Sequence, residues 1–283
     1  MCLILLAWRA HPEYPLIFAG NRDEAYERPS SAAAFWADDP RIFGGRDLER
    51  GGTWLGLTRT GRMAAVTNYR DGPGTRVAPR SRGELTAAFL RGTDAPRAYL
   101  ERVAARAADY GGFALIVGDS DGLYCISNRR PGIEEIAPGI HGLSNRLLDT
   151  PWPKVERGKQ RLSALLQAKE TELVHGLLDA LADRTVAPDS ELPDTGVGLP
   201  RERELSPAFV TGERYGTRAS TALLIGSGND VLCVERRFGA RGAPEGDVTQ
   251  RFALYKRARG RNTKAAVNSP RERGATLAAG PSR

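Results

Sequence analysis

Apolar residues in this chain occur in short runs that are typical of buried β-strands. The first two runs, at residues 2–8 and 16–19, are almost entirely apolar and flank a turn at 11–15. We therefore expect a hairpin in a sheet that is covered on both faces. Further strand-like runs lie at residues 42–45, 54–58, 63–68, 113–117, 123–127, 139–145, 219–225 and 231–235.

Segments with helical signals separate these strands in two pairs. The sequence Ser-Arg-Gly-Glu at 81–84 is a capping box that predicts the start of one helix, and Pro96 begins the next. A second pair is predicted at about residues 154–168 and 172–183, followed by a surface loop at 187–200. Because strands and helices do not alternate one by one, antiparallel sheets are favoured. The predicted fold class is α+β, a four-layer αββα sandwich with two antiparallel sheets between helix layers.

Charge is unevenly distributed along the 283 residues. Residues 239–283 contain ten Lys/Arg and three Asp/Glu, which account for the entire net charge of +7, whereas residues 1–238 carry 31 of each sign. The basic segment is poor in apolar residues, so we expect one domain at 1–238 and a largely disordered tail at 239–283, in which 252–255 suggests a short helix. The balanced charge of the domain argues against specific nucleic-acid binding.

Several classes of protein are disfavoured by what the sequence lacks. No apolar run approaches the ~20 residues that span a bilayer, and the first run is too short for a signal peptide, so we expect no transmembrane segment and a cytoplasmic protein. The three cysteines, Cys2, Cys125 and Cys233, have no disulfide or metal-ligand spacing. No glycine-rich nucleotide loop is present. We expect no metal site and no required cofactor.

The position of Cys2 directly after Met1 makes its thiol a candidate nucleophile. Removal of Met1 would place an α-amine, with a pKa of about 8, beside a thiol with a pKa of about 8.5. Such an amine can accept the thiol proton and activate the sulfur without a histidine. The alternative is that Cys2 is a small apolar residue at the start of a strand.

Polar residues at the ends of predicted strands are candidates to complete a site around Cys2. The sequence Asn-Arg-Asp-Glu at 21–24 follows the second strand, and taken alone it also fits a turn with a surface ion pair. Asn68 and Asn145 end two further runs, where their amides can donate to an oxyanion or form turns. Arg218 precedes an apolar strand, where its cation needs a buried carboxylate or an anionic ligand.

An ordered series of short motifs resembles a known family. The motifs are Met-Cys at 1–2, Asn-Arg-Asp-Glu at 21–24, Gly-Gly-Thr-Trp-Leu-Gly at 51–56, Thr-Asn-Tyr-Arg at 67–70, Ser-Arg-Gly-Glu at 81–84, Leu-Ser-Asn at 143–145, Pro-Trp-Pro-Lys at 151–154 and Tyr-Gly-Thr-Arg at 215–218. Together they closely resemble the NRDE family, also called the transport and Golgi organization protein 2 family, up to about residue 238. That family resembles N-terminal nucleophile (Ntn) hydrolases of the bile salt hydrolase and penicillin V acylase type, which implies the same four-layer sandwich.

The resemblance implies a site and two functional hypotheses. The expected catalytic residues are Cys2, Arg22, Asp23, Asn68, Asn145 and Arg218, and the expected substrate-binding residues are Asn21, Glu24, Tyr69, Arg70 and His141. In the first hypothesis the protein is a cysteine hydrolase that cleaves an amide or a thioester. The family's association with haem and with acyl-CoA or lipid handling implies the second, a non-catalytic carrier of haem or an acyl-CoA in the same cleft. Because Arg22 and Asp23 are adjacent in a strand, we expect them to point to opposite sides.

Overall fold

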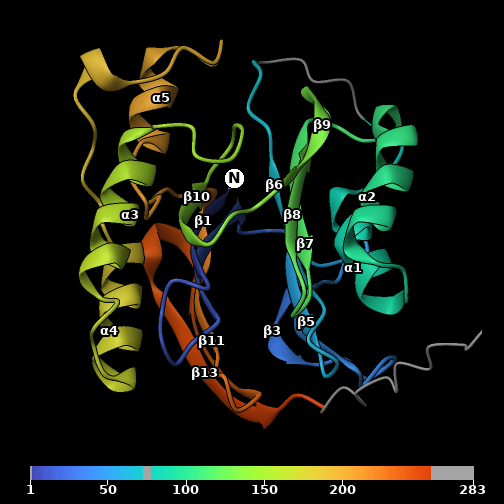
Figure 1. Cartoon of the computed structure of the whole chain (residues 1–283). Helices are drawn as coiled ribbons and strands as arrows, with labels where there is room; N and C mark the ends of the chain where they lie inside the picture. Colours follow the sequence, from blue (N-terminus) through green and yellow to red (C-terminus); the bar gives the residue numbers. More distant parts are fainter. Residues whose placement is uncertain (1, 73–77, 256–283) are drawn as a thin grey trace, which may run out of the picture.

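Two antiparallel β-sheets lie face to face at the centre of the protein, and helices cover the outer face of each sheet (Figure 1). The computed structural model describes residues 2–72 and 78–255. The four layers, helix, sheet, sheet and helix, confirm the predicted αββα sandwich. Among the described residues, no helix combines the length and the apolarity that crossing a membrane requires.

The first sheet, called sheet A, contains the predicted N-terminal hairpin and has six strands among the described residues. In spatial order these are β10 (Gly139–Leu143), β1 (Cys2–Trp8), β2 (Leu16–Ala25), β11 (Tyr215–Ile225), β12 (Asp230–Phe238) and β13 (Pro244–Ala253). All neighbouring strands are antiparallel. β1 is buried along its whole length, as expected for an uninterrupted apolar run that is covered on both faces.

The second sheet, called sheet B, has seven strands in the described part of the chain. They follow the chain in space: β3 (Ser30–Phe35), β4 (Ile42–Asp47), β5 (Leu55–Thr58), β6 (Met63–Asn68), β7 (Phe113–Gly118), β8 (Leu123–Ser127) and β9 (Arg130–Glu135). Helices α1 (Arg82–Arg91) and α2 (Pro96–Ala105) cover sheet B, and α3 (Pro153–Ala164) and α4 (Glu170–Leu181) cover sheet A. Each helix pair connects two strands of the sheet that it covers, which is why the helices occur in pairs along the sequence.

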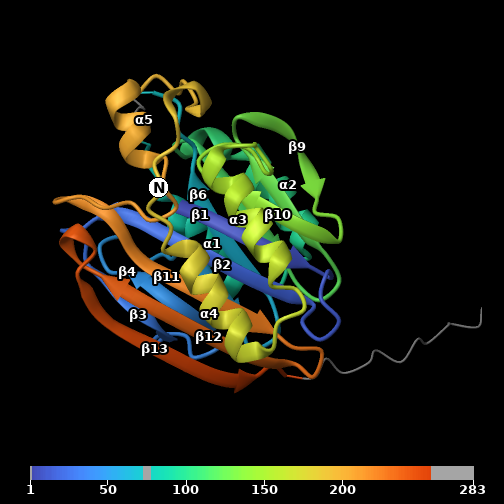
Figure 2. The same cartoon turned by 90° about the vertical axis from the view of Figure 1, so that its left-hand side faces the viewer.

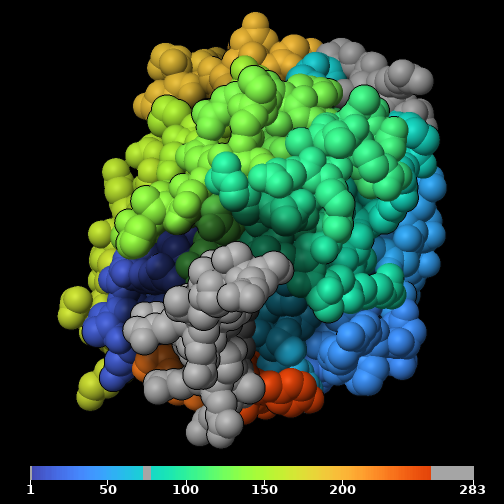
Figure 3. All heavy atoms as spheres, turned by 45° about the vertical axis from the view of Figure 1, so that its right-hand side comes forward, coloured from blue at the N-terminus to red at the C-terminus, as the bar shows by residue number. Residues whose placement is uncertain are grey.

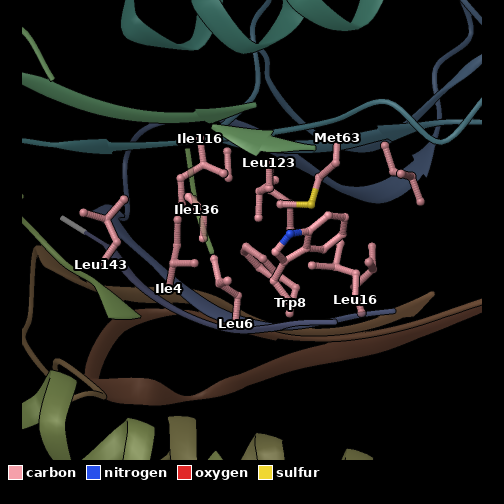
Figure 4. Packing of buried hydrophobic residues seen from close by; sticks show 14 of the residues in the cluster. Ile4, Leu6, Trp8, Leu16, Met63, Ile116, Leu123, Ile136 and Leu143 are labelled. Carbon is pink, nitrogen blue, oxygen red and sulfur yellow. The ribbon is translucent and has the colours of Figure 1, made fainter. Parts of the chain in front are cut away.

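Strand alternation divides β1 between two cores. Ile4 and Trp8 face sheet B, where they join the core between the sheets with residues such as Leu123 (Figure 4). Leu3 and Leu5 face the other way and pack with apolar residues of α3 and α4. Both sides of the strand are therefore stabilised by burial of apolar surface.

Two of the sequence motifs meet where α1 begins. A Cβ atom on Gly52 would lie 2.5 Å from the carbonyl carbon and oxygen of Gly83, so both motifs need glycine at this close approach. The helix starts after Ser81, as predicted, but the Ser81 side chain does not cap it. The Glu84 side chain pairs with Arg80 instead, so the capping box itself is not formed.

Sheet A extends past the domain boundary that was predicted at residue 238. Residues Pro244–Ala253 form β13, an edge strand in which Val248 and Phe252 are the partly buried positions. The Phe252 ring lies 5.0 Å from the rings of Phe35 and Phe43, between centroids, and this aromatic contact holds it in a strand rather than in the predicted short helix. The rest of the predicted tail, 256–283, lies outside the described residues.

The other unpredicted elements are short and lie at the edges. β3 and β9 are edge strands, and polar, exposed positions interrupt their apolar pattern. The predicted loop at 187–200 runs into a helix, α5 (Leu199–Leu205), which lies at one end of the sandwich (Figure 2). In the space-filling view this segment forms the top of the molecule, and the β1–β2 turn lies low in the same view (Figure 3).

Candidate active site

Residues 21–24 lie inside β2 rather than after it, and strand alternation sends them to opposite faces. Arg22 is paired directly opposite Cys2 of β1 and shares its face, which looks toward sheet B. Asn21 faces the helices, since its Nδ2 donates to the carbonyl of Leu181 at the end of α4. Asp23 lies on that same side, so Arg22 and Asp23 point apart as predicted.

A row of facing residues crosses four strands of sheet A. Cys2 lies opposite Arg22, Arg22 opposite Ala219 of β11, and Ala219 opposite Arg237 of β12. Arg218 falls outside this row because a β-bulge shifts the register immediately before Ala219. The sheet therefore presents one thiol and two guanidinium groups on the face that looks toward sheet B.

A pocket of about 390 Å³ lies on this face. Of the residues predicted for the site, those that line it are Cys2, Arg22, Asp23, Glu24, Asn68 and Arg218. The residues that the sequence reasoning missed are Arg28, Arg46, Asp47, Arg50, Arg80, Arg82, Arg237 and Glu235. Among the described residues the lining contains eight arginines and four acidic residues, so the pocket has an excess of positive charge.

The arginines of the pocket differ in how well they are paired. Arg28 has a strong partner, with its Nη2 2.6 Å from the Asp47 carboxylate. Among the described residues, the buried Nη1 atom of Arg22 has no hydrogen-bond partner. The Nη2 atom of Arg22 lies 3.8 Å from the Glu24 carboxylate. Arg82 donates to one backbone carbonyl, and burial lowers the pKa of its guanidinium. An anionic ligand would supply the missing partners.

On the opposite face of β2, Asn21 is fully enclosed by hydrogen bonds. Its Nδ2 donates to the carbonyls of Leu181 and Ala208, each at 2.8 Å, and its Oδ1 accepts from the Ser220 hydroxyl at 2.7 Å. The residue has no exposed surface and does not line the pocket. The structure therefore gives Asn21 a place in the sheet–helix layer and not the substrate contact that was expected.

Asp23 and Cys2 are both buried, and burial raises the pKa of each group. The Asp23 carboxylate accepts a hydrogen bond from the Thr217 hydroxyl at 2.7 Å, and the positive charge of the N-terminus, followed by those of Lys154 and Arg22, acts to lower its pKa. The charge of the N-terminus, that of Arg22 and a hydrogen bond from the Asp23 backbone N–H act to lower the thiol pKa, and the Asp23 carboxylate acts to raise it, but desolvation is the largest effect. A reaction at Cys2 therefore requires a base.

A small network ties the start of β1 to the end of β6. The Ser144 hydroxyl donates to the Cys2 carbonyl at 3.1 Å, and the Thr67 hydroxyl donates to the Ser144 carbonyl at 2.8 Å. Asn145 has no exposed surface, and its Nδ2 donates to the Asn68 carbonyl at 2.9 Å. Asn145 thus holds the backbone that carries Asn68, and of the two predicted amides only Asn68 lines the pocket.

Arg70 is engaged on the far side of this network, away from the pocket lining. Its Nη1 lies 2.7 Å from the Glu202 carboxylate of α5, and both side chains are almost fully buried. Its guanidinium also stacks over the Trp152 ring at 4.5 Å from the centroid. The predicted substrate contact by Arg70 is replaced here by a buried ion pair that anchors α5.

His141 and Tyr69 also lie outside the pocket lining. The His141 Nδ1 is 2.7 Å from the Asp149 carboxylate and its Nε2 is 2.9 Å from the Ala137 carbonyl, so both ring nitrogens are engaged. The Tyr69 ring lies under the guanidinium of Arg146, 5.0 Å from its centroid. Neither residue is placed to contact a ligand beside Cys2.

Arg218 lines the pocket, but its cation is stabilised differently from the prediction. Its Nη1 donates to the carbonyls of Ala25, Tyr26 and Arg28, each at 3.0 Å, rather than to a carboxylate. These bonds hold the turn that follows β2. The Nε atom is buried and has no hydrogen-bond partner among the described residues, and burial lowers the pKa of the guanidinium group.

Glu235 is the buried pocket residue for which the sequence did carry a signal. It ends the apolar run of β12, where a carboxylate at an inward position needs a partner. Its Oε1 accepts from the Ala33 backbone N–H at 2.8 Å, at an irregularity in β3 that leaves this N–H out of the ladder. The pocket arginines contributed by loops, by α1 and by the interior strands β4 and β12 carried no such signal, because arginine is common throughout the chain.

The architecture places the protein among Ntn hydrolase folds. The C2A mutant of conjugated bile acid hydrolase from Clostridium perfringens superposes with a TM-score of 0.51, covering 90% of this chain and 92% of that one. The two sequences are 7% identical, so the likeness concerns the fold alone. In both respects that the sequence predicted, two antiparallel sheets and outer helix layers, the fold class is confirmed.

Within that class the chain belongs to the transport and Golgi organisation 2 family. The model of this family matches residues 1–240. The transport and Golgi organization protein 2 homologs of Bos taurus and Homo sapiens are 37% and 36% identical over 260 and 256 residues, which is 83% of this chain and 92% of each relative. The Drosophila melanogaster protein is 29% identical over 263 residues. The resemblance inferred from the motifs is confirmed.

Proposed function

We propose that the protein is a cysteine hydrolase that cleaves an amide or thioester bond in an anionic acyl compound, with Cys2 as its nucleophile. The observation that supports this most directly is the place of Cys2 in the wall of a positively charged pocket. Cys125, in contrast, lies in the apolar core between the sheets, where burial raises the pKa of its thiol to about 12.

The proposed reaction begins with removal of Met1, which frees the α-amine of Cys2. The amine accepts the thiol proton, the sulfur attacks the carbonyl carbon, and the oxyanion accepts hydrogen bonds from the Asn68 amide and a backbone N–H. The protonated amine then protonates the leaving group as the C–N or C–S bond breaks. Water, deprotonated by the same amine, releases the acyl group from Cys2. The chain supplies every group, so no cofactor is required.

The charge of the pocket supports an anionic substrate. Guanidinium groups bind carboxylates and phosphates through two parallel N–H donors, and Arg22 and Arg82 have donors that no carboxylate of residues 2–72 or 78–255 occupies. Acyl-CoA thioesters and N-acyl amino acids both combine a cleavable acyl bond with such an anion. A reducing cytoplasmic compartment, which we also propose, would keep the Cys2 thiol free.

The test is hydrolysis of a panel of acyl-CoA thioesters and N-acyl amino acids by protein whose Met1 removal has been verified by intact mass. Cys2→Ala is expected to lower turnover by about 1,000-fold or more, because it removes the nucleophile. Cys125→Ala, a change in the core between the sheets, is the matched control and should keep turnover. Activity that survives in Cys2→Ala protein would remove Cys2 from the mechanism.

The second candidate is a carrier that binds haem or an acyl-CoA in this pocket without cleaving it. Burial raises the pKa of the Cys2 thiol, and a neutral thiol is a poor nucleophile, which is compatible with acyl-CoA binding without cleavage. With both nitrogens of His141 engaged, Cys2 is the axial haem ligand that this version requires. Absorbance titration with haem decides it: a Soret band unaffected by Cys2→Ala ends the haem version. Saturable acyl-CoA binding without hydrolysis would favour the carrier.

A further inference from the structure

Lys154 is a buried cation that the proposed reaction does not use. It belongs to the Pro-Trp-Pro-Lys motif and lies in the first turn of α3, where only 2% of its surface is exposed. Its Nζ donates to the carbonyl of Leu205 at 2.8 Å and reaches that of Pro207 at 3.5 Å. A buried ammonium group is costly unless an opposite charge compensates it, so its partner matters.

The backbone that Lys154 holds is also held by the helix-facing side of β2 and β11. Asn21 donates to the Ala208 carbonyl at 2.8 Å. The Thr217 hydroxyl accepts from the Val210 N–H at 2.9 Å and donates to Asp23 at 2.7 Å. Segment 205–210 therefore connects Lys154 to the carboxylate of Asp23 through buried hydrogen bonds.

The charged groups around Lys154 single out Asp23 as its counter-charge. The groups that act on it are Asp23 of β2, Cys2 of β1, Arg70 after β6 and Glu202 of α5. Arg70 and Glu202 neutralise each other in their own ion pair at 2.7 Å. Two further positive charges act on Asp23: the N-terminal amine, whose effect is larger than that of Lys154, and Arg22 on the opposite face of β2, whose effect is smaller.

We propose that Lys154 is a positioning residue whose buried ammonium group keeps Asp23 ionised beside Cys2 and holds segment 205–210 against β2. Burial lowers the pKa of Lys154 to about 8, so its charge is lost in the mildly alkaline range. Asp23 then loses a charge that lowers its own pKa, and Cys2 loses a nearby cation that favours its thiolate. The catalytic part of this inference rests on the proposed hydrolase, whereas the electrostatic part does not.

The experiment compares wild type, Lys154→Met, Lys154→Arg and the control Lys159→Met, a lysine of the same helix that pairs with Asp149 at the surface. The first readout is the pH dependence of Cys2 alkylation by iodoacetamide, with peptide mass spectrometry to separate Cys2 from the other cysteines. The second is the pH profile of hydrolysis. Below about pH 8, where the wild-type ammonium group is charged, loss of the cation in Lys154→Met should slow Cys2 alkylation about tenfold and move the acid limb of hydrolysis up by about one pH unit.

Lys154→Arg carries a charge that does not titrate in this range, so it should keep the wild-type acid limb and lack the fall in activity above about pH 8. Lys159→Met should match wild type. A purely structural role would lower rates at every pH without moving a midpoint. If Lys154→Met folds and its acid limb of hydrolysis has the wild-type midpoint, the proposal is overturned. If Lys154→Met does not fold, an unchanged fall in activity above about pH 8 in Lys154→Arg would overturn it. Slower alkylation of Lys154→Met confined to pH values below about 8, without turnover on any substrate, would remove the hydrolase and leave the electrostatic role of Lys154.

Discussion

The two faces of β2 differ in how completely their polar groups are bonded, although the residues are consecutive in the sequence. On the helix side, Asn21 uses both ends of its amide and Asp23 bonds to Thr217. On the pocket side, Arg22 has a buried nitrogen that no described residue hydrogen-bonds, and its Nη2 lies 3.8 Å from the Glu24 carboxylate.

This difference indicates that one face of β2 contributes to stability and the other to ligand binding. A buried polar group that is bonded contributes about 1 kcal/mol to stability, whereas one left without a partner costs about 1–3 kcal/mol. The unpaired Arg22 nitrogen lowers the stability of the protein, but it lies on the pocket side, where a ligand can supply its hydrogen-bond partner. We therefore expect substitutions on the helix side to change stability and substitutions on the pocket side to change binding.

The largest expected effect is that of Asn21→Leu. The substitution keeps the approximate volume but leaves the carbonyls of Leu181 and Ala208 and the Ser220 hydroxyl without their partner. We expect the free energy of unfolding to fall by about 4 kcal/mol, since each orphaned group costs about 1–3 kcal/mol. Urea denaturation measures this free energy, and a loss below about 1 kcal/mol would show that the helix side of β2 does not carry the stability assigned to it.

Glu202→Ala tests the second buried contact on the helix side. It leaves the Arg70 guanidinium without its carboxylate and removes the acceptor of the Thr195 backbone N–H. Breaking one partner of a buried ion pair typically costs about 3 kcal/mol or more. Glu204→Ala, an exposed residue of the same helix that pairs with Arg201, is the control and should change thermal stability little.

Arg22→Met tests the pocket side directly. Because the ion-pair contact of Arg22 within the described part of the chain is the 3.8 Å one to Glu24, its removal should change the free energy of unfolding by no more than about 0.5 kcal/mol. Binding of an anionic acyl compound should weaken about tenfold or more, with a shallower salt dependence, because a charge-assisted hydrogen bond contributes about 1.5–3 kcal/mol. Calorimetry at two salt concentrations measures both. Equal binding with lost stability would reverse the assignment of the two faces.

The smallest expected effect is the pH dependence of Glu235→Gln. Burial raises the pKa of Glu235 above its ordinary value of 4.5, so the folded state resists ionisation while the unfolded state does not. Wild type therefore loses stability as the pH rises above about 4.5. Glutamine cannot ionise, and its oxygen can still accept from the Ala33 N–H. The melting temperature of the variant relative to wild type should be higher at pH 8 than at pH 4.

Some of the candidate site could be predicted because its signals are local. The apolar runs of β1 and β2 defined the hairpin, and strand alternation predicted that Arg22 and Asp23 point apart. The role of Asn145 could not be predicted in this way. An amide at the end of a run looks the same in sequence whether it faces a pocket or, as here, a neighbouring backbone carbonyl.

The sequence by itself determined the layers of the fold and the motifs that identify the family, because periodicity and residue order are properties of neighbouring positions. Only the tertiary structure decided which polar residues meet. The pairing of four strands of sheet A puts Cys2, Arg22 and Arg237 on one face, and Arg28 from a turn and Arg82 from α1 reach the same pocket from outside this row. The charge of the pocket depends on which residues of distant strands lie opposite one another, and a local sequence pattern carries no information about that pairing.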